Sequence, residues 1–422
     1  MSKRVVITGL GVISPNGTNI PDFLHAIQNG VSGIRFVPQY EDLKFNCQVT
    51  GTPEFEMEQL RNYITETSLY GLKGKGIAYG IKAALDAWMD AGNEIVSHET
   101  LWDTGCIFGS SVADTDVIKN AINRVDAKES KKLGSRVVEQ IMNSGVTAYI
   151  SGRLGIGNRV ISNSSACATG TQAICMGYEY IKNGMAKRMV VGSSEYVDAY
   201  VFGAFDSMRV LSRKYNDAPE KASRPMSMSA GGFVPGSGAG ALVIEDLDHA
   251  LARGAKIYAE ILGGSNNSGG QRGGGTMTAP ASEGVVRCIQ EAITDAGIGP
   301  ERIDLISGHL TATVADKFEI QNWTKALGRK GDDFPMVNSL KSMIGHCLSA
   351  AGSIEMVAAI LQLEHGFVHP NINLEDPNPE IIDLISENNL PKKMVNKDIN
   401  VIAKANFGFG DINACLIISK YN

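Results

Sequence analysis

A glycine-rich turn that leads into an apolar strand occurs twice in this chain, once near the middle and once near the end. The first copy spans Gly236–Ile244 and the second spans Gly408–Ile418. A repeat of such long period indicates duplication of a domain-sized unit rather than a solenoid. We therefore predict two similarly built halves, residues 1–250 and 251–422, which join near Asp248–Gly254.

Between these turns, strand-like and helix-like segments alternate, which is typical of an α/β fold with a mostly buried sheet. The clearest strand-like segments are Val5–Thr8, Thr104–Gly109, Asn158–Ser162, Lys187–Gly192, Lys256–Gly263 and Ile303–Gly308. The clearest helix-like segments are Gly76–Ala91, Ala168–Lys182 and Ser349–His365, the last of which ends at Gly366. Two sheets built this way would pack around shared helices, and loops from both halves would meet at one site.

Composition excludes several classes of function. A length of 422 residues is enough for two domain-sized cores. The net charge of -6 gives no electrostatic case for binding nucleic acid. There is no run of about 18 apolar residues for a membrane span and no apolar stretch for a signal peptide, so we expect a cytoplasmic protein.

One of the seven cysteines, Cys167, has a distinctive environment. It lies between the strand-like Asn158–Ser162 and the helix-like Ala168–Lys182, among small residues that would let a bulky thioester approach. The N-terminal end of a helix favours a thiolate, so we expect an activated nucleophile. The seven cysteines are scattered and show no zinc-like spacing, so neither a disulfide framework nor a metal site is predicted.

Two of the seven histidines also stand apart. His309 follows the strand-like Ile303–Gly308, and His346 precedes the apolar helix-like segment. At a helix N-terminus the cationic form of a histidine is disfavoured, so we expect His346 to be a neutral imidazole that donates one N–H. The remaining histidines are expected to be structural or on the surface: His25, His98, His249, His365 and His369.

A third segment, Asn406–Asp411, places two phenylalanines among glycines just before the last strand. The glycines would let the Phe409 ring move while its backbone N–H stays available. Ordinary packing of a hydrophobic turn is an equally open explanation.

Together these segments resemble the beta-ketoacyl-[acyl carrier protein] synthases of the elongating type, and most of all synthase II. The resemblance covers essentially the full length, and it is most specific at Ser165–Gly170, Lys341–His346 and Phe407–Gly410. It implies the thiolase fold, two similar halves in a layered α-β-α-β-α architecture, and a homodimer. It also implies decarboxylative Claisen condensation without a cofactor, because the substrates are carried on the phosphopantetheine arm of acyl carrier protein.

The resemblance assigns catalytic roles to five positions. Cys167 would take the acyl group, and His309 and His346 would promote decarboxylation of the malonyl-thioester and stabilise the enolate. Lys341 and the buried acid Glu319 would support the histidine network. The resemblance also implies an oxyanion hole formed by the backbone N–H groups of Cys167 and Phe409, and a gate formed by the Phe409 side chain. Thr311 and Thr313 would contact the pantetheine arm. Phe205 and Val112 would line the acyl pocket, and Arg209 would face the carrier protein.

These residue types suit the chemistry. Forming a carbon–carbon bond needs a stored acyl electrophile, which a thiolate nucleophile provides. Loss of carbon dioxide generates the carbanion, so no strong base is needed. Two imidazole N–H donors would instead stabilise charge on the enolate oxygen.

The chain departs from the family pattern around the site. Leu310 stands where the family usually has glycine, and the stretch from His309 to Asp316 is one residue shorter than usual. Asp411 and Ile412 follow the Gly-Phe-Gly turn, where glycine and threonine are common. We expect these changes to reshape the mouth of the pantetheine tunnel. They suggest a specialised synthase for a secondary lipid, aryl polyene or polyketide rather than the main fatty-acid enzyme.

Other functions were weighed against this one. A non-condensing chain-length factor, paired with a synthase-like subunit, has the same fold but lacks the cysteine that this chain keeps. A degradative thiolase would carry a second catalytic cysteine near the C-terminus, whereas Cys415 lies within a strand-like run. Gly9-Leu-Gly11 lacks the third glycine of a dinucleotide fingerprint, and Gly269–Gly275 lacks the Gly-Lys-Ser/Thr of a phosphate loop.

Overall fold

A mixed sheet of ten strands runs through the molecule in the order β10-β9-β13-β14-β8-β1-β7-β6-β4-β5. The computed structural model describes residues 2–95, 98–112 and 114–421. Strands from the first half of the chain are β1 (Val5–Ile13), β4 (Thr104–Gly109), β5 (Val160–Ile161), β6 (Arg188–Glu195) and β7 (Gly238–Asp246). Strands from the second half are β8 (Ala259–Ser268), β9 (Leu305–Ser307), β10 (Met336–Asn338), β13 (Val401–Gly408) and β14 (Ile412–Ser419).

The strand order repeats between the two halves. From the centre outward, the first half runs β1-β7-β6-β4-β5 and the second runs β8-β14-β13-β9-β10. In each half the two inner pairings are antiparallel and the two outer pairings are parallel. The glycine-rich turns noted in the sequence lead into the equivalent strands β7 and β14, which explains their similarity.

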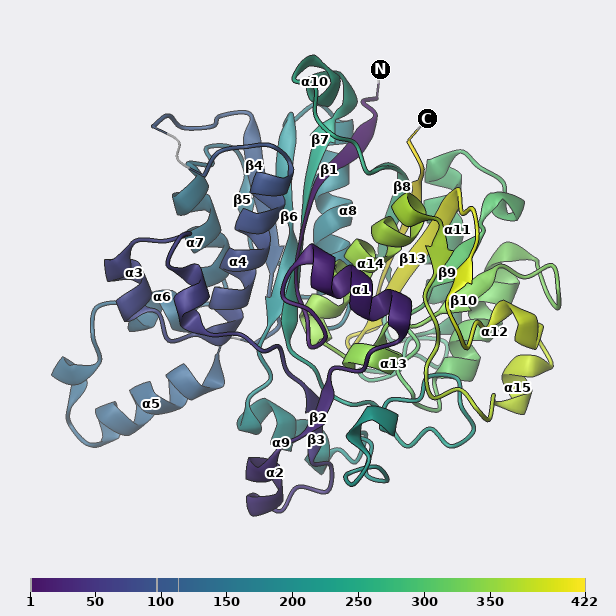
Figure 1. The fold of residues 1–422 in the computed structure, drawn as a ribbon, viewed down its shortest axis with the longest axis horizontal. Coiled ribbons are helices and arrows are strands. Elements are labelled where there is room, and N and C mark those ends of the chain that lie inside the picture. The colour runs from purple at the N-terminus through teal and green to yellow at the C-terminus, as the bar shows by residue number, and fades with distance from the viewer. Residues whose placement is uncertain (1, 96–97, 113, 422) are drawn as a thin grey trace.

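The two halves lie side by side and join edge to edge (Figure 1). β1 and β8 pair antiparallel over three residues, Val5–Ile7 with Ala259–Ile261. The segment predicted as the join, Asp248–Gly254, overlaps a short helix, α10 (Leu247–Ala252). The chain termini emerge close together at the same end of the molecule (Figure 1).

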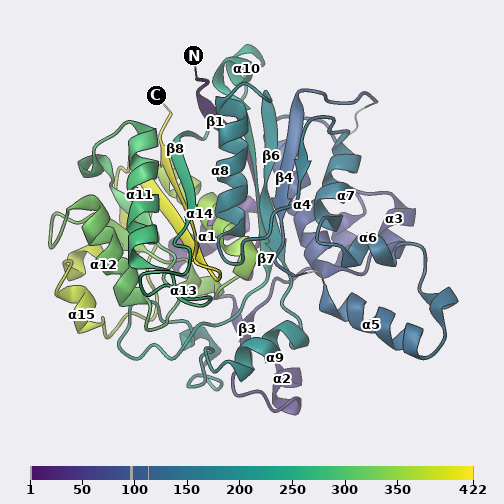
Figure 2. The same cartoon turned by 180° about the vertical axis from the view of Figure 1, so that it is seen from behind.

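Helices form three layers around the strands (Figures 1 and 2). In the middle, α8 (Thr169–Lys182) and α14 (Ala351–His365) pack against strands of both halves. The outer layers are α4 (Lys75–Asp90) and α7 (Gly145–Leu154) on the first half, and α11 (Ser282–Ala296) with α12 (Asp316–Leu327) on the second. The predicted layered α/β architecture is therefore confirmed.

The remaining elements are short and lie mostly around the ends of the strands. The helices are α1 (Ile20–Asn29), α2 (Pro38–Asp42), α3 (Glu66–Gly71), α5 (Thr115–Asp126), α6 (Val137–Ile141), α9 (Ala199–Ser207), α13 (Lys341–Ile344) and α15 (Pro379–Ile382). The strands are β2 (Ile34–Phe36), β3 (Val49–Gly51), β11 (Phe367–Val368) and β12 (Val395–Asn396). Across the described residues, we find no helix with the length and apolarity that a membrane crossing needs.

Most predicted boundaries agree closely with the structure. β4 has the predicted limits, and α8 begins one residue later than expected. The prediction that the last long helix begins at Ser349 is wrong, because residues Leu348–Ala350 form a 3-10 turn before α14. That helix does end at Gly366, whose φ of 64° is the left-handed conformation that glycine adopts most readily.

Candidate active site

Four loops of the candidate site follow the carboxyl ends of strands. Cys167 follows β5, His309 follows β9, His346 follows β10 and Phe409 follows β13. In open α/β sheets, ligands bind at this end of parallel strands. The duplication also gives Cys167 and His346 equivalent positions, since each lies between an outermost strand and a central helix. The two halves thus bring one nucleophile and one imidazole to the same place.

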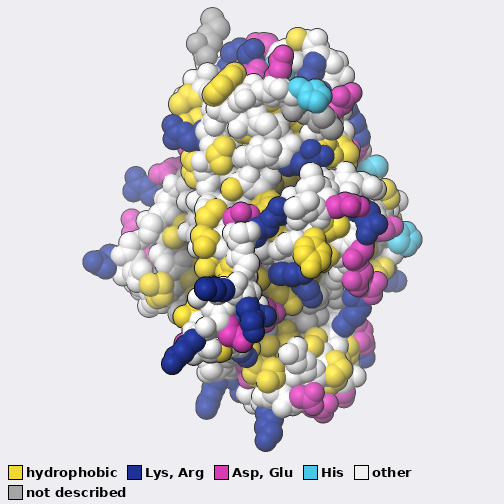
Figure 3. Space-filling model, turned by 90° about the vertical axis from the view of Figure 1, so that its left-hand side faces the viewer, with side chains coloured by type: hydrophobic (Ala, Val, Ile, Leu, Met, Phe, Trp, Pro, Cys, Tyr) yellow, Lys and Arg dark blue, Asp and Glu magenta, His cyan; other side chains and the backbone are white. Residues whose placement is uncertain are grey.

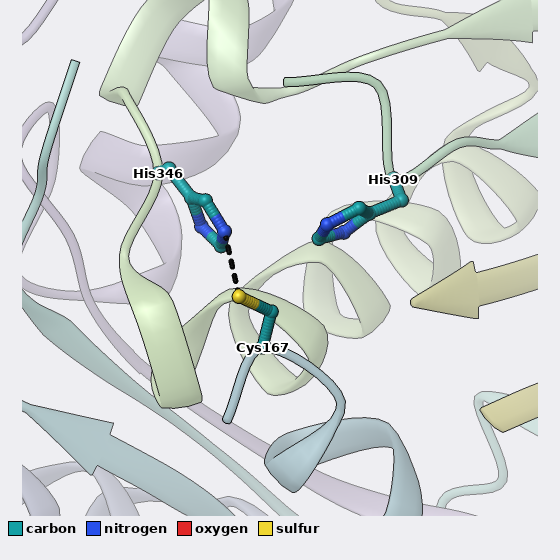
Figure 4. Close-up of side chains that lie close together, drawn as sticks. All are labelled: Cys167, His309 and His346. Atoms are coloured by element: carbon teal, nitrogen blue, oxygen red, sulfur yellow. Dashed lines mark hydrogen bonds between the residues drawn. The ribbon is translucent and has the colours of Figure 1, made fainter. Parts of the chain in front are cut away.

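Cys167, His309 and His346 converge on one point (Figure 4). The Sγ atom of Cys167 is 3.1 Å from Nε2 of His346. One nitrogen of each imidazole and the sulfur all lie within 4.8 Å of one another. The two imidazole rings are 5.3 Å apart and nearly perpendicular, at 83°. A carbonyl oxygen placed beside Cys167 would therefore lie within reach of both rings.

The hydrogen bonds of His346 determine where its proton lies. The backbone N–H of Leu348 donates to Nδ1 of His346 at 3.2 Å. A backbone N–H only donates, so a neutral His346 carries its proton on Nε2, facing the sulfur. Burial, assisted by the nearby Lys341 ammonium, lowers the pKa of His346 to about 3. Burial is thus the main cause that favours the predicted neutral imidazole, and its role as an N–H donor to a substrate stays a prediction. A metal ion would instead need the Nε2 lone pair.

The sulfur of Cys167 differs from the sequence expectation. Burial raises its pKa to about 11, although the Lys341 charge and the backbone N–H groups of Phe409 and Cys167 lower it. The sequence predicts that the helix N-terminus favours the thiolate, but desolvation outweighs the charge and the donors around the sulfur. A pKa near 11 favours the thiol at neutral pH.

The turn before Phe409 packs directly against the cysteine loop. A Cβ atom on Gly408 would lie 3.2 Å from the backbone nitrogen of Cys167 and 2.7 Å from the oxygen of Ser165, so only glycine allows this close approach. The backbone N–H groups of Phe409 and Cys167 lower the pKa of the Cys167 thiol. The oxyanion hole that the sequence assigns to these two N–H groups stays a prediction.

Aromatic rings continue from this turn to His346. The Phe409 ring is half-buried, and its centroid is 6.4 Å from that of Phe205. Phe205 contacts Phe233 at 5.4 Å, and Phe233 contacts the His346 ring at 5.5 Å. Phe205 therefore lies beside the site, as the sequence suggested.

His309 is held mainly through its backbone. Glu319, on α12, accepts the backbone N–H of His309 and that of Leu310, both at 2.7 Å. Burial raises the pKa of Glu319 to about 7. Burial also lowers the pKa of His309 well below 6.5, with contributions from Lys341, His346 and Lys404. Glu319 thus supports the histidine loop without being the carboxylate that pairs with Lys341.

The acid that pairs with Lys341 is Glu355, on the central helix α14. The ammonium of Lys341 donates to the backbone oxygen of His309 at 2.5 Å and to Oε1 of Glu355. The ammonium of Lys404 lies 2.7 Å from Oε2 of the same carboxylate. All three charged side chains are at most 1% exposed. Sequence reasoning missed Glu355 and Lys404, although a charge within a strongly apolar helix or strand was an available signal.

Asn406, on β13, was also missed, and it connects this cluster to His309. Its Nδ2 is 3.0 Å from Oε2 of Glu355 and 3.0 Å from Nδ1 of His309. Its Oδ1 accepts the hydroxyl of Thr171 at 2.6 Å. Thr171 lies on α8, the helix that follows the nucleophile. Asn406 therefore contacts elements from both halves of the chain.

The loop after His309 is compact. The hydroxyls of Thr311 and Thr313 are half-buried and 3.0 Å apart. Asp316 accepts the backbone N–H groups of Thr311 and Ala312, which fixes the loop. Leu310 is 1% exposed and belongs to the core of the second half. The side chain of Leu310 thus packs inward, and the expected effect of this loop on the pantetheine tunnel stays a prediction.

Two predicted residues lie on the surface of the chain. Val112 is 39% exposed and lines a cavity of about 20 Å³, large enough for one water molecule. Arg209 is exposed at the end of α9 and has a positive φ of 60°. Their assignments to acyl-chain depth and carrier contact stay predictions.

Family models match most of the chain. A model described as "Beta-ketoacyl synthase, N-terminal domain" matches residues 2–250, and "Beta-ketoacyl synthase, C-terminal domain" matches residues 258–375. The chain is 34% identical over 429 residues to 3-oxoacyl-[acyl-carrier-protein] synthase 1 of Haemophilus influenzae, with 100% of both covered. It is 33% identical over 427 residues to synthase 2 of Vibrio harveyi, covering 100% of this chain and 99% of the relative.

Solved structures give the same result. A beta-ketoacyl synthase from Burkholderia phymatum has a TM-score of 0.91 at 28% identity, covering 100% of both chains. The ishigamide ketosynthase/chain length factor has a TM-score of 0.88, also at 28% identity and full coverage. A type II polyketide acyl-carrier protein in complex with its ketosynthase, bound to a hexaketide, gives 0.86 at 28% identity and full coverage.

The full-length matches agree with the geometry of the site. Two family models and relatives above 30% identity over the whole chain indicate a beta-ketoacyl synthase. The thiolase-like ketosynthase fold indicates the same family. The activity is that of a 3-oxoacyl-[acyl-carrier-protein] synthase, an acyltransferase that performs a condensation in fatty acid or polyketide synthesis. The chain therefore belongs to the beta-ketoacyl synthase family.

Proposed function

We propose that Cys167 accepts an acyl group from a carrier thioester and that the site condenses it with malonyl-[acyl carrier protein]. In the first step the sulfur of Cys167 attacks the thioester carbonyl, and the pantetheine thiol leaves. The thiol proton of Cys167 ends on the departing pantetheine sulfur, so the exchange is balanced. The N–H groups of Phe409 and Cys167, beside the sulfur, support stabilisation of the tetrahedral oxygen.

In the second step the malonyl-thioester loses carbon dioxide. The electron pair of the broken carbon–carbon bond stays on the thioester and forms an enolate. Neutral His309 and His346 would donate N–H bonds to the enolate oxygen. The carbanion then attacks the acyl carbonyl on Cys167 and forms the carbon–carbon bond. Cys167 leaves as a thiolate, which takes up one proton from water and returns to the thiol. The observation that carries the proposal is the convergence of the thiol and two neutral imidazoles within 4.8 Å.

The remaining site residues fit the path of a carrier-bound substrate. Thr311 and Thr313 would contact the pantetheine arm, and Phe205 and Val112 the acyl chain. Phe409 would act as a gate, while Arg209, which is exposed, would face the carrier. No cofactor is needed, because carbon dioxide release drives the condensation. We place the reaction in the cytoplasm or an equivalent compartment, as its relatives are bacterial or chloroplastic.

We further propose a specialised pathway and a dimer. Structurally similar proteins include the ishigamide ketosynthase/chain length factor and a type II polyketide ketosynthase, and Asp411 departs from the usual family turn. Hydrophobic side chains lie among basic and acidic ones on the side of the molecule that carries α5 and α6 (Figure 3). Its exposed apolar residues include Ile122, Val125 and Val138. A homodimer would cover them. A chain-length-factor role within a heterodimer is the alternative, which the Cys167 site opposes.

The direct test is intact mass after mixing the protein with acyl-[acyl carrier protein] thioesters, with Cys167→Ala in parallel. Saturated and polyenoyl acyl groups should be compared at equal concentration. We expect a mass gain equal to the acyl group that the Cys167→Ala variant lacks, and faster loading of polyenoyl chains. Equal loading of saturated chains would contradict the specialised pathway. No loading by any carrier thioester would contradict the acyltransfer role of Cys167.

A further inference from the structure

A buried cluster of charge lies directly behind His309. Glu355 is 1% exposed, and its carboxylate is paired with both Lys341 and Lys404, which are equally buried. Between this carboxylate and the imidazole of His309 lies the side-chain amide of Asn406, which is 0% exposed. Glu319 is separate from this cluster and accepts the backbone N–H of His309.

The charge on Glu355 decides which way the Asn406 amide points. A carboxylate accepts hydrogen bonds and cannot donate them, so the group 3.0 Å from Oε2 of Glu355 must be the NH₂ of Asn406. In the opposite orientation, the amide oxygen would face a buried carboxylate. The observed orientation also gives Oδ1 the hydroxyl of Thr171 as a donor, at 2.6 Å. The ammonium of Lys404 lies 2.7 Å from the same Oε2 atom.

The same NH₂ group then determines the tautomer of His309. An amide nitrogen has two hydrogens, and the geometry gives one to Glu355 and the other to Nδ1 of His309, at 3.0 Å. Because Nδ1 accepts, the proton of the neutral imidazole lies on Nε2. The ring points toward Cys167 (Figure 4), so Nε2–H is directed at the place where the enolate oxygen forms.

We infer that Asn406 is a positioning residue that holds His309 in its Nε2–H tautomer, and that Glu355 and Lys404 fix the orientation of Asn406. The inference rests on the proposed role of His309 as an N–H donor to the enolate. The tautomers of the two histidines are then set by different groups. The Leu348 backbone sets the tautomer of His346, and a charge-oriented side chain sets that of His309.

The wild-type protein provides the first test, by ¹⁵N NMR of histidine-labelled protein with His309 assigned through a His309→Gln variant. We expect a protonated Nε2 and an unprotonated Nδ1 at neutral pH. A protonated Nδ1 on His309 would overturn the inference. This measurement needs no substrate, so it stands even if the proposed function fails.

The second test is an Asn406→Asp variant. Its carboxylate would accept from His309 and force the Nδ1–H tautomer, leaving a lone pair toward the substrate. We expect release of carbon dioxide from malonyl-[acyl carrier protein] to fall at least about 100-fold, as for loss of an oxyanion donor. Acyl transfer to Cys167 should stay close to the wild-type rate, because it does not use His309.

The matched control is Asn413→Asp, which also replaces a buried side-chain amide by a carboxylate. Asn413 lies on the adjacent strand β14, and its amide donates to Asn267. We expect it to keep the decarboxylation rate. If Asn406→Asp does not fold, Asn406→Ala replaces it, with a smaller loss expected because both tautomers become accessible. Wild-type decarboxylation by a folded Asn406 variant would overturn the inference. A wild-type protein that neither loads nor decarboxylates would instead contradict the proposed function.

Discussion

Replacing Glu355 by glutamine should destabilise the whole fold. The carboxylate of Glu355 is the shared partner of two buried ammonium groups, those of Lys341 and Lys404. Glutamine keeps the size and shape of the side chain but removes its charge. Two buried cations would then lack their counter-charge, and one of them also contacts the backbone of the His309 loop.

The magnitude follows from the electrostatics of the cluster. Burial alone would raise the pKa of Glu355, but Lys341 and Lys404 outweigh it and lower the pKa from 4.5 to about 2. A difference of this size corresponds to about 3 kcal/mol, since one pKa unit is about 1.4 kcal/mol. Removing one member of a buried ion pair typically costs about 3–5 kcal/mol, which agrees.

The direction of the pH dependence follows as well. The pKa of Glu355 is lower in the folded protein than in the unfolded chain, so the ionised carboxylate stabilises the fold at neutral pH. This contribution is present above about pH 4.5 and is lost as the pH falls toward 2. The Glu355→Gln variant should therefore lose less stability on acidification than the wild type over that range.

The assay is urea unfolding followed by fluorescence, at pH 7 and at about pH 3, which lies within the range where the contribution of Glu355 is lost. The control is Glu375→Gln, which removes the charge that pairs with Arg224. The Glu375 side chain is 70% exposed, so this substitution should cost less than about 1 kcal/mol of unfolding free energy. Adding Lys404→Met to Glu355→Gln should recover part of the loss, because it removes one unpaired cation. A free energy of unfolding for Glu355→Gln within about 1 kcal/mol of wild type would refute the reasoning.

Three further outcomes are expected. His346→Ala removes the N–H that faces the sulfur, so steady-state condensation should fall about 10²–10³-fold; a loss below tenfold would contradict the donor role. Alkylation of Cys167 by iodoacetamide should keep accelerating from pH 7 to pH 10, because burial raises the pKa of the thiol to about 11, whereas a plateau near pH 8 would contradict this value. Asp411→Ala removes the carboxylate that accepts the backbone N–H groups of Gln271 and Ala281, both at 2.9 Å, so proteolysis between them should accelerate; unchanged cleavage would contradict that anchoring role.

The sequence predicted the limits of a helix or strand well where a single local feature sets them. The limits of β4 follow from a short apolar run bounded by polar residues, and the end of α14 follows from Gly366. The start of α14 was misplaced because a 3-10 turn continues the same apolar pattern. The internal repeat of glycine-rich turns predicted two halves, but not that a three-residue pairing of β1 with β8 joins their strands.

The site was predictable only in part. Cys167, His309 and His346 were identified from motifs, and the structure brings them together. The charge state of Cys167 was not predictable, because desolvation depends on packing from both halves of the chain. Glu355, Lys404 and Asn406 were missed because they lie in elements that look like core, and their partners are distant in sequence. A buried charge in an apolar helix, matched by one in an apolar strand, was the available signal.

The most direct test of the account is single-turnover condensation by protein already acylated on Cys167, mixed with malonyl-[acyl carrier protein]. The account predicts that carbon dioxide and beta-ketoacyl-[acyl carrier protein] form in equal amounts while the acyl mass leaves Cys167, and that His309→Ala blocks both products but not the initial acylation. Carbon dioxide release without a condensed product, or condensation that survives His309→Ala unchanged, would contradict it.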